Sequence, residues 1–265
     1  MTATKPQPPL QSDAAGEAFP MPPTDLPYDD GEPLESARHR IAMNLLIDSI
    51  NHHWADRNDF YVGGNMFLYY STEQVKNRDF RGPDFFLVLG VKNTPGRKYW
   101  AIWEEGGKYP NVIIELMSDS TAEIDRTEKK RIYEQTFKTS DYFIFDPYDS
   151  TSLQGWHLDQ NQCYQDLTPD SRGWLWCQTL GLWLGFWEGV VTREPAIWLR
   201  FYTPNGQLVL LPGEQAQLQA EQAQLQAEQA QLQAEQAQLQ AEQANQRAER
   251  LAAQLRQMGI DPDAV

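Results

Sequence analysis

The spacing of apolar residues predicts that helices and strands alternate in the middle of the chain. Between Arg38 and Trp54, apolar positions recur three or four residues apart, which indicates an amphipathic helix. Short apolar runs bounded by glycine, proline and polar turns indicate β-strands. These runs occupy residues 60–70, 84–91, 99–103, 111–117 and 142–146. A second helix is expected to run to about Lys138, with Ser120 or Thr121 as its capping residue. The predicted fold class is therefore α/β (α+β).

The regions before and after these predicted elements have other compositions. Beyond Ser150 we expect short tryptophan-rich strands and turns, packed on the sheet as edge hairpins. Residues 1–30 are rich in proline and acid and lack periodicity, which predicts a disordered arm.

A strict seven-residue repeat, EQAQLQA, begins at Glu214. From Ala216 to Ala248, alanine recurs at alternating intervals of four and three residues, which is the spacing of a coiled-coil seam. Residues 213–258 are therefore expected to form one helix of roughly 70 Å that joins a second copy of the chain, followed by a short tail at 259–265. A solvated single helix is the alternative.

Composition narrows the classes of function. The 265 residues include 22 Lys and Arg against 37 Asp and Glu, a formal net charge of −15. This balance argues against a protein coated in positive charge for nucleic-acid binding, although a local basic patch stays compatible with it. Two cysteines are too few for a disulfide framework, which favours a cytoplasmic location. We expect no signal peptide and no membrane span, because the most apolar stretch, 174–191, is interrupted by Gln, Glu and Gly.

Two acidic residues stand within the apolar strands. Asp84 begins one strand, and Glu115 lies near the end of another. A carboxylate in such a run is costly to bury unless it binds a positive group, and two on neighbouring strands would suit a hard cation such as Mg²⁺. Lys129 on the next helix shares one face with Asp125 and Tyr133, and a lysine beside metal-binding carboxylates can polarise an attacking water. Taken singly, each acid is also compatible with an exposed strand end, and the lysine with a solvated helix face.

The order and spacing of Pro83-Asp84, Glu115 and Lys129 resemble those of the Uma-type restriction endonucleases of bacteria, within the PD-(D/E)XK nuclease superfamily. The other similar segments are DGEPLES at 30–36 with His39, ELMSDST at 115–121, the Asp125-Lys129-Tyr133 helix, YFIFDP at 142–147, LGLWLGFWEG, WLRFYTPNGQLV and the final LRQMGIDPD. The sequence departs from the pattern at Met117, where the superfamily has lysine, and at Asp119, where the family usually has proline.

The resemblance implies a nuclease domain over residues 31–212, with a mixed β-sheet flanked by helices, that hydrolyses phosphodiester bonds. Asp84, Glu115 and the main-chain carbonyl of Leu116 would bind Mg²⁺ or Mn²⁺, and Lys129 would enter the cleft from its helix. An acid before the first helix would complete the site, Glu35 being the candidate and Glu32 the reserve. His39 would contact phosphate or the metal-bound water; a packing role at the start of the helix is the alternative.

Basic residues on both sides of this cleft are expected to contact DNA, which would be double-stranded. Arg78 and Arg81 precede Asp84, and Arg126 and Lys130 lie on the helix after Glu115. An ordinary charged surface is the alternative. The sequence thus predicts a metal-dependent DNA endonuclease that assembles through residues 213–258. A nuclease-fold scaffold or nucleic-acid-binding protein without hydrolysis, and a nuclease acting on RNA or branched DNA, stay open.

Overall fold

The computed structural model describes residues 23, 26–28, 36–71 and 81–259. Glu32, Glu35 and Arg78, and most of the arm expected at residues 1–30, lie outside this part of the chain. The chain divides into two compact units, residues 1–40 with 58–167 and residues 41–57 with 168–265.

The first unit contains a mixed β-sheet, as the resemblance implies. Within the described residues its six strands lie in the order β1-β3-β5-β6-β7-β8. The bounds are Phe60–Gly63, Phe85–Leu89, Val112–Leu116, Asp141–Asp146, Asp149–Leu158 and Tyr164–Asp166. The pair β5–β6 is parallel, and the other neighbours are antiparallel. Two short parallel strands, β2 (Leu68–Tyr69) and β4 (Trp100–Ala101), form a separate pair.

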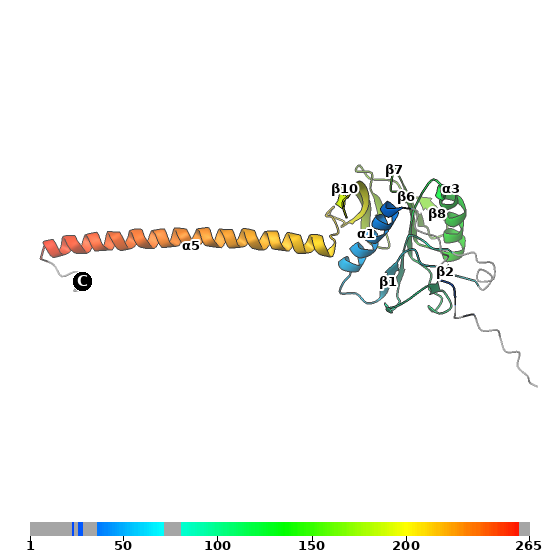
Figure 1. Ribbon diagram of the computed structural model, residues 1–265, viewed down its shortest axis with the longest axis horizontal. Helices are drawn as coiled ribbons and strands as arrows, with labels where there is room; N and C mark the ends of the chain where they lie inside the picture. The colour runs from blue at the N-terminus through cyan, green and yellow to red at the C-terminus, as the bar shows by residue number, and fades with distance from the viewer. Residues whose placement is uncertain (1–22, 24–25, 29–35, 72–80, 260–265) are drawn as a thin grey trace, which may run out of the picture. The chain divides into compact units, whose positions relative to one another are not determined.

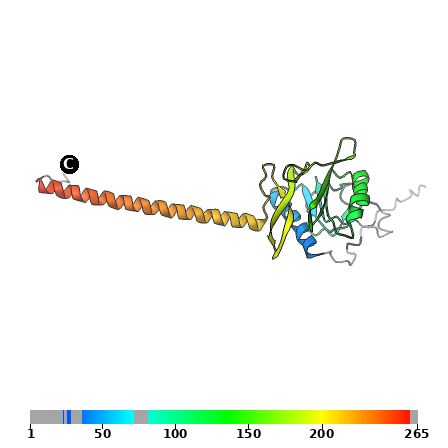
Figure 2. The same ribbon diagram turned by 90° about the horizontal axis from the view of Figure 1, so that it is seen from above.

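A helical segment connects β5 to β6 and lies alongside the strands of the first unit (Figure 2). It consists of α3 (Ala122–Ile124), η1 (Asp125–Lys129), α4 (Lys130–Ile132) and η2 (Tyr133–Phe137), and both η segments are π-helical. Ile132, Tyr133 and Phe137 share a buried core with Ile113 and Ile144 of the sheet. The apolar face of the segment therefore covers one face of β5 and β6.

The second unit contains an antiparallel sheet and the long helix. Among the described residues, the strands β11 (Glu194–Tyr202), β10 (Leu182–Val191) and β9 (Leu175–Cys177) lie in this order. The helix α5 runs continuously from Pro212 to Gln257 (Figure 1).

The first turn of α5 is held to β11 by a charged group. Arg200, which is fully buried, donates two hydrogen bonds to the Glu214 carboxylate at 3.0 and 2.7 Å and a third to the Val209 carbonyl. The Leu211 N–H donates to the same carboxylate at 2.8 Å. The first glutamate of the repeat therefore anchors the helix. No helix in the described part of the chain is both long enough and apolar enough to cross a membrane.

The predicted first helix is confirmed as α1 (Ala37–His53), and the strand expected at 111–117 is confirmed as β5. Three expectations were wrong. The strand at 99–103 is only the two-residue β4. The strands beyond Ser150 are not all short edge hairpins, because β7 has ten residues and lies between β6 and β8 in the main sheet. Half of β7 is small and polar, which hides it from an apolar pattern. Thr121 occupies the capping position, but its hydroxyl accepts the Ser118 N–H instead of capping the helix.

Candidate active site

The strand register brings the two predicted carboxylates together. In the antiparallel pair β3–β5, Phe85 lies opposite Ile114, so Asp84 comes opposite Glu115. Asp84 Oδ2 accepts the Leu116 N–H at 2.8 Å, and the Glu115 side chain is 1 % exposed. Two residues 31 positions apart in the sequence thus lie on adjacent strands at one end of the pair.

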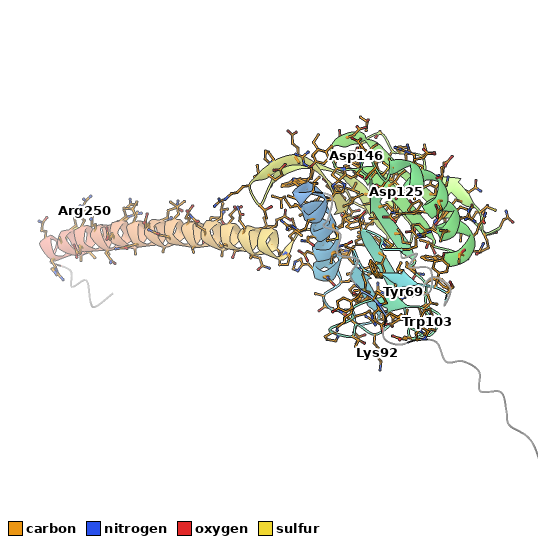
Figure 3. The ribbon with its side chains drawn as sticks, turned by 45° about the vertical axis from the view of Figure 1, so that its right-hand side comes forward. Tyr69, Lys92, Trp103, Asp125, Asp146 and Arg250 are labelled. Atoms are coloured by element: carbon orange, nitrogen blue, oxygen red, sulfur yellow. The ribbon has the colours of Figure 1, made fainter. Side chains whose placement is uncertain are left out.

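The ammonium group of Lys129 reaches these strands from the helical segment. Its Nζ lies 3.1 Å from Glu115 Oε2 and 2.7 Å from Asp125 Oδ1. Asp125, which Figure 3 labels on this segment, is also buried. Tyr133, one turn further along, donates its hydroxyl hydrogen to Glu115 Oε1 at 2.6 Å. The candidate site is therefore a buried, charged group of side chains from three segments.

The π-helical turns help to align this group. In an α-helix, residues four apart drift by about 40° around the axis, because one turn takes 3.6 residues. A π turn is wider and reduces that drift, and such turns are frequent at functional sites. Asp125, Lys129 and Tyr133 stand at intervals of four in a segment that contains two π stretches; Lys129 and Tyr133 both contact Glu115 of β5, and Asp125 contacts Lys129.

The electrostatics of the group follow from its burial. Burial raises the pKa of Glu115; Lys129 lowers it, and Asp125 and Asp84 raise it further, so that it reaches about 8. Burial alone would lower the pKa of Lys129, but the carboxylates of Glu115, Asp125 and Asp84 outweigh this and hold it above its ordinary value. Burial and the nearby Glu115 also raise the pKa of Tyr133, so its hydroxyl stays a hydrogen-bond donor.

The residues present fit a weakly coordinated divalent cation better than a fully protein-bound one. No group of three or more His, Cys, Asp and Glu side chains in the described part of the chain has the arrangement of a metal site. Mg²⁺, however, needs only one or two carboxylates and keeps several waters. Glu115 Oε2 and Asp125 Oδ1 are buried, and the Lys129 ammonium lies 3.1 Å from the first and 2.7 Å from the second. A divalent cation held by Glu115 would therefore share this carboxylate with the ammonium group.

His39 lies at the end of β5, where both ring nitrogens face protein atoms. It is 5 % exposed, with Nδ1 2.8 Å from Ser36 Oγ and Nε2 3.1 Å from the Met117 carbonyl oxygen. This geometry fits the alternative that His39 packs and positions the start of the helix. Its contact with phosphate, like the metal contact of the Leu116 carbonyl, stays a prediction.

The predicted DNA-binding residues have different surroundings. Arg81 is paired with Glu128 at 2.7 Å, and Lys130 Nζ lies 4.1 Å from the centre of the Trp156 ring. Arg126 is exposed. The intramolecular partners of Arg81 and Lys130 would compete with a phosphate, so of these three residues Arg126 has the most accessible charge.

Sequence reasoning placed Asp125 and Tyr133 on the face of Lys129 but gave them no role. The structure makes both of them direct partners of the candidate site. Tyr142, on β6, donates its hydroxyl hydrogen to the Asp125 carbonyl at 2.8 Å, which ties the segment to the sheet. For Asp125, the sequence did contain a signal: an acid four residues before a lysine is typical of an ion pair on a helix.

Comparisons with known proteins identify the family of this chain. The family model Uma2, described as "Putative restriction endonuclease", matches residues 15–192. A search of curated proteins found no match. The chain is also similar to the crystal structure of a "putative nuclease belonging to DUF820" from Anabaena variabilis ATCC 29413, with 12% sequence identity and a TM-score of 0.41, over 57% of this chain and 80% of that chain. Because the family model spans more than half of the sequence, this chain belongs to the Uma2 family.

Proposed function

We propose that this chain is a metal-dependent DNA endonuclease that hydrolyses phosphodiester bonds. The observation that carries the proposal is the convergence of Glu115, Lys129 and Asp84 from two strands and a helix, with the ammonium nitrogen 3.1 Å from Glu115 Oε2. Membership of the Uma2 family supports a nuclease as the class of enzyme.

Each side chain has a role in this mechanism. Asp84 and Glu115 would hold Mg²⁺ or Mn²⁺, with the Leu116 carbonyl as a further ligand. A bound divalent ion would neutralise charge on the phosphate and lower the pKa of a bound water. Lys129 stays charged at neutral pH because its pKa is raised. It therefore orients the attacking water and stabilises the negative charge of the transition state, instead of accepting a proton.

Two further residues hold these groups in place. Asp125 fixes the Lys129 ammonium at 2.7 Å, and Tyr133 fixes one oxygen of Glu115 and leaves the other toward the lysine. Such supporting contacts keep a catalytic group in its productive geometry before the substrate arrives.

The substrate and the assembly belong to the same proposal. Arg126 and the other basic residues near the site would contact the phosphates of double-stranded DNA. Pairing of two chains through residues 213–258 would supply one active site for each strand. Cys163 and Cys177 are both free thiols, which supports a reducing compartment such as the cytoplasm.

The test is cleavage of supercoiled plasmid in Mg²⁺ or Mn²⁺. We expect the wild type to cut, and Asp84→Asn, Glu115→Gln and Lys129→Met each to lose about 100-fold or more in rate. Lys92→Met removes an exposed ammonium group of the first unit to which no role is assigned, so this variant is the control and should keep most of the activity. Cleavage that persists in Asp84→Asn and Lys129→Met would reject this site. A wild type that cuts neither plasmid, RNA nor branched DNA would favour a nuclease-fold scaffold.

A further inference from the structure

A cavity lies in the first unit, where the parallel strands β5 and β6 end. Its volume is about 520 Å³. Ser118 and Asp119 line it from the segment after β5, Asp146 from the last position of β6, and Tyr148 from the turn that follows. We call it the end pocket. Ligands of open α/β sheets bind beyond the carboxyl ends of the strands, and a cavity of about 300–1,000 Å³ is typical for small ligands.

The end pocket is close to the candidate active site along the chain. Ser118 follows Glu115 by three residues, and His39, which also lines the pocket, contacts the Met117 main chain at 3.1 Å. Figure 3 shows Asp146 and Asp125 toward the same end of the first unit. A substrate strand bound at Glu115 would therefore have its neighbouring nucleotide within reach of the pocket.

The two carboxylates that line the pocket favour hydrogen-bond donors over phosphate. Asp119 is exposed, and Asp146 accepts the Tyr148 N–H through Oδ1 at 2.8 Å. Two carboxylates repel an anion and accept N–H groups. Tyr148 is 61% exposed, and the Arg38 guanidinium covers one face of its ring, 4.4 Å from the ring centre. A flat aromatic ligand would stack on the opposite face, as bases do on aromatic side chains.

We propose that the end pocket receives an unpaired nucleobase of the substrate strand, and that guanine is the base it prefers. This inference rests on the nuclease function proposed above. Guanine presents two adjacent donors, its N1–H and its 2-amino group, which match the two oxygens of a carboxylate. Thymine presents a single N–H between two carbonyl groups, which the acids would repel. Enzymes that read a base in this way bind it outside the stack, and this costs least where the strand is already unpaired.

The test measures binding without hydrolysis. The probes are two fluorescent single-stranded oligonucleotides of thymine with one central guanine or, in its place, hypoxanthine, which lacks the 2-amino group. Anisotropy is measured in EDTA with the full chain. We expect the wild type to bind the guanine probe about fivefold or more tightly than the hypoxanthine probe, the discrimination typical of a two-bond contact to a base edge.

Variants separate the pocket from general charge effects. In the double variant Asp119→Asn/Asp146→Asn, the preference for guanine should disappear, while the amide oxygen at position 146 can still accept the Tyr148 N–H. Tyr148→Ala should weaken the binding of both probes. Asp166→Asn, which removes one negative charge from an exposed position on β8 that does not line the pocket, should keep the preference.

Two results would overturn the inference: equal affinity of the wild type for both probes, including no binding of either, or a preference that survives in the double variant. Plasmid cleavage in Mn²⁺ is measured separately. A wild type that cuts without discriminating the probes rejects the pocket and leaves the nuclease standing. A wild type that discriminates without cutting rejects the nuclease and leaves the pocket standing.

Discussion

Replacing Lys129 with methionine removes the ammonium group that lies between two buried carboxylates. The Nζ atom is 2.7 Å from Asp125 and 3.1 Å from Glu115, and both carboxylates are 1 % exposed. At an effective dielectric constant of about 20, a charge pair about 4 Å apart contributes about 4 kcal/mol, much of which the burial of the ions offsets. Removing one partner of a buried pair costs about 3–5 kcal/mol, because the other charge is left uncompensated.

For Lys129→Met we expect the free energy of unfolding to fall by about 3 kcal/mol, at the lower end of this range. Glu115 already has a raised pKa, so it can take up a proton once the ammonium is gone. A raised carboxyl pKa means that the folded state binds this proton more tightly than the unfolded state. Stability therefore falls as the pH rises from the ordinary pKa of 4.5 toward 8, and the gap between wild type and variant should widen over that window.

The assay is urea unfolding in EDTA, followed by tryptophan fluorescence. With a slope of about 2 kcal/mol per molar urea, a loss of about 3 kcal/mol lowers the midpoint by about 1.5 M at neutral pH. The matched control is Lys130→Met, whose ammonium stands over the Trp156 ring and should contribute only about 0.5–1 kcal/mol. Added Mg²⁺ should raise the midpoint of Lys129→Met more than that of the wild type, since the cation would replace the missing charge.

The reasoning is refuted if Lys129→Met unfolds at the same urea concentration as Lys130→Met. That result would mean that the ammonium does not compensate the buried carboxylates. A gap that stays constant from about pH 5 to 8 would contradict the part of the argument that concerns Glu115.

Two predictions concern the second unit. Glu214→Gln should lower the free energy of unfolding by about 2 kcal/mol in urea at neutral pH, because buried Arg200 loses its charged partner. The loss is smaller than for a fully buried pair, because the Glu214 carboxylate is partly exposed. Glu221→Gln, in the next repeat, should leave the urea midpoint unchanged. Burial would raise the pKa of Glu214, but hydrogen bonds and charge from Arg200 lower it, so this contribution is complete above pH 4.5 and is lost as the pH falls through the lowered pKa. If the alanine seam joins two chains, Ala230→Glu should reduce the mass in sedimentation equilibrium and Leu232→Glu, on the other stripe, should not; the opposite pattern would assign the interface to the leucines.

The sequence allowed prediction of the separate elements better than of their pairing. A helix such as α1 and strands such as β5 have a local periodicity, which a single segment contains in full. The register that puts Asp84 opposite Glu115 depends on which strands become neighbours, and alternation defines only the two faces of a strand. The resemblance to a family supplied the pairing of these acids. The contact between Tyr133 and Glu115 had no such signal, since an aromatic residue on the inner face of a helix is usually core.

The sheet topology explains how a lysine on a helix can replace one on the strand. Because β5 and β6 are parallel, the chain must cross over between them, and a helix on one face is the usual connection. Glu115 and Met117 point to the same face of β5, the face that this helical segment covers, and Met117 is part of the core there. A lysine at position 117 would thus have pointed to the same side of the sheet. Lys129 reaches the same side from the helical segment that covers this face. The crossover connection therefore determines where the ammonium group lies, and a lysine two residues after Glu115 on the strand is not needed.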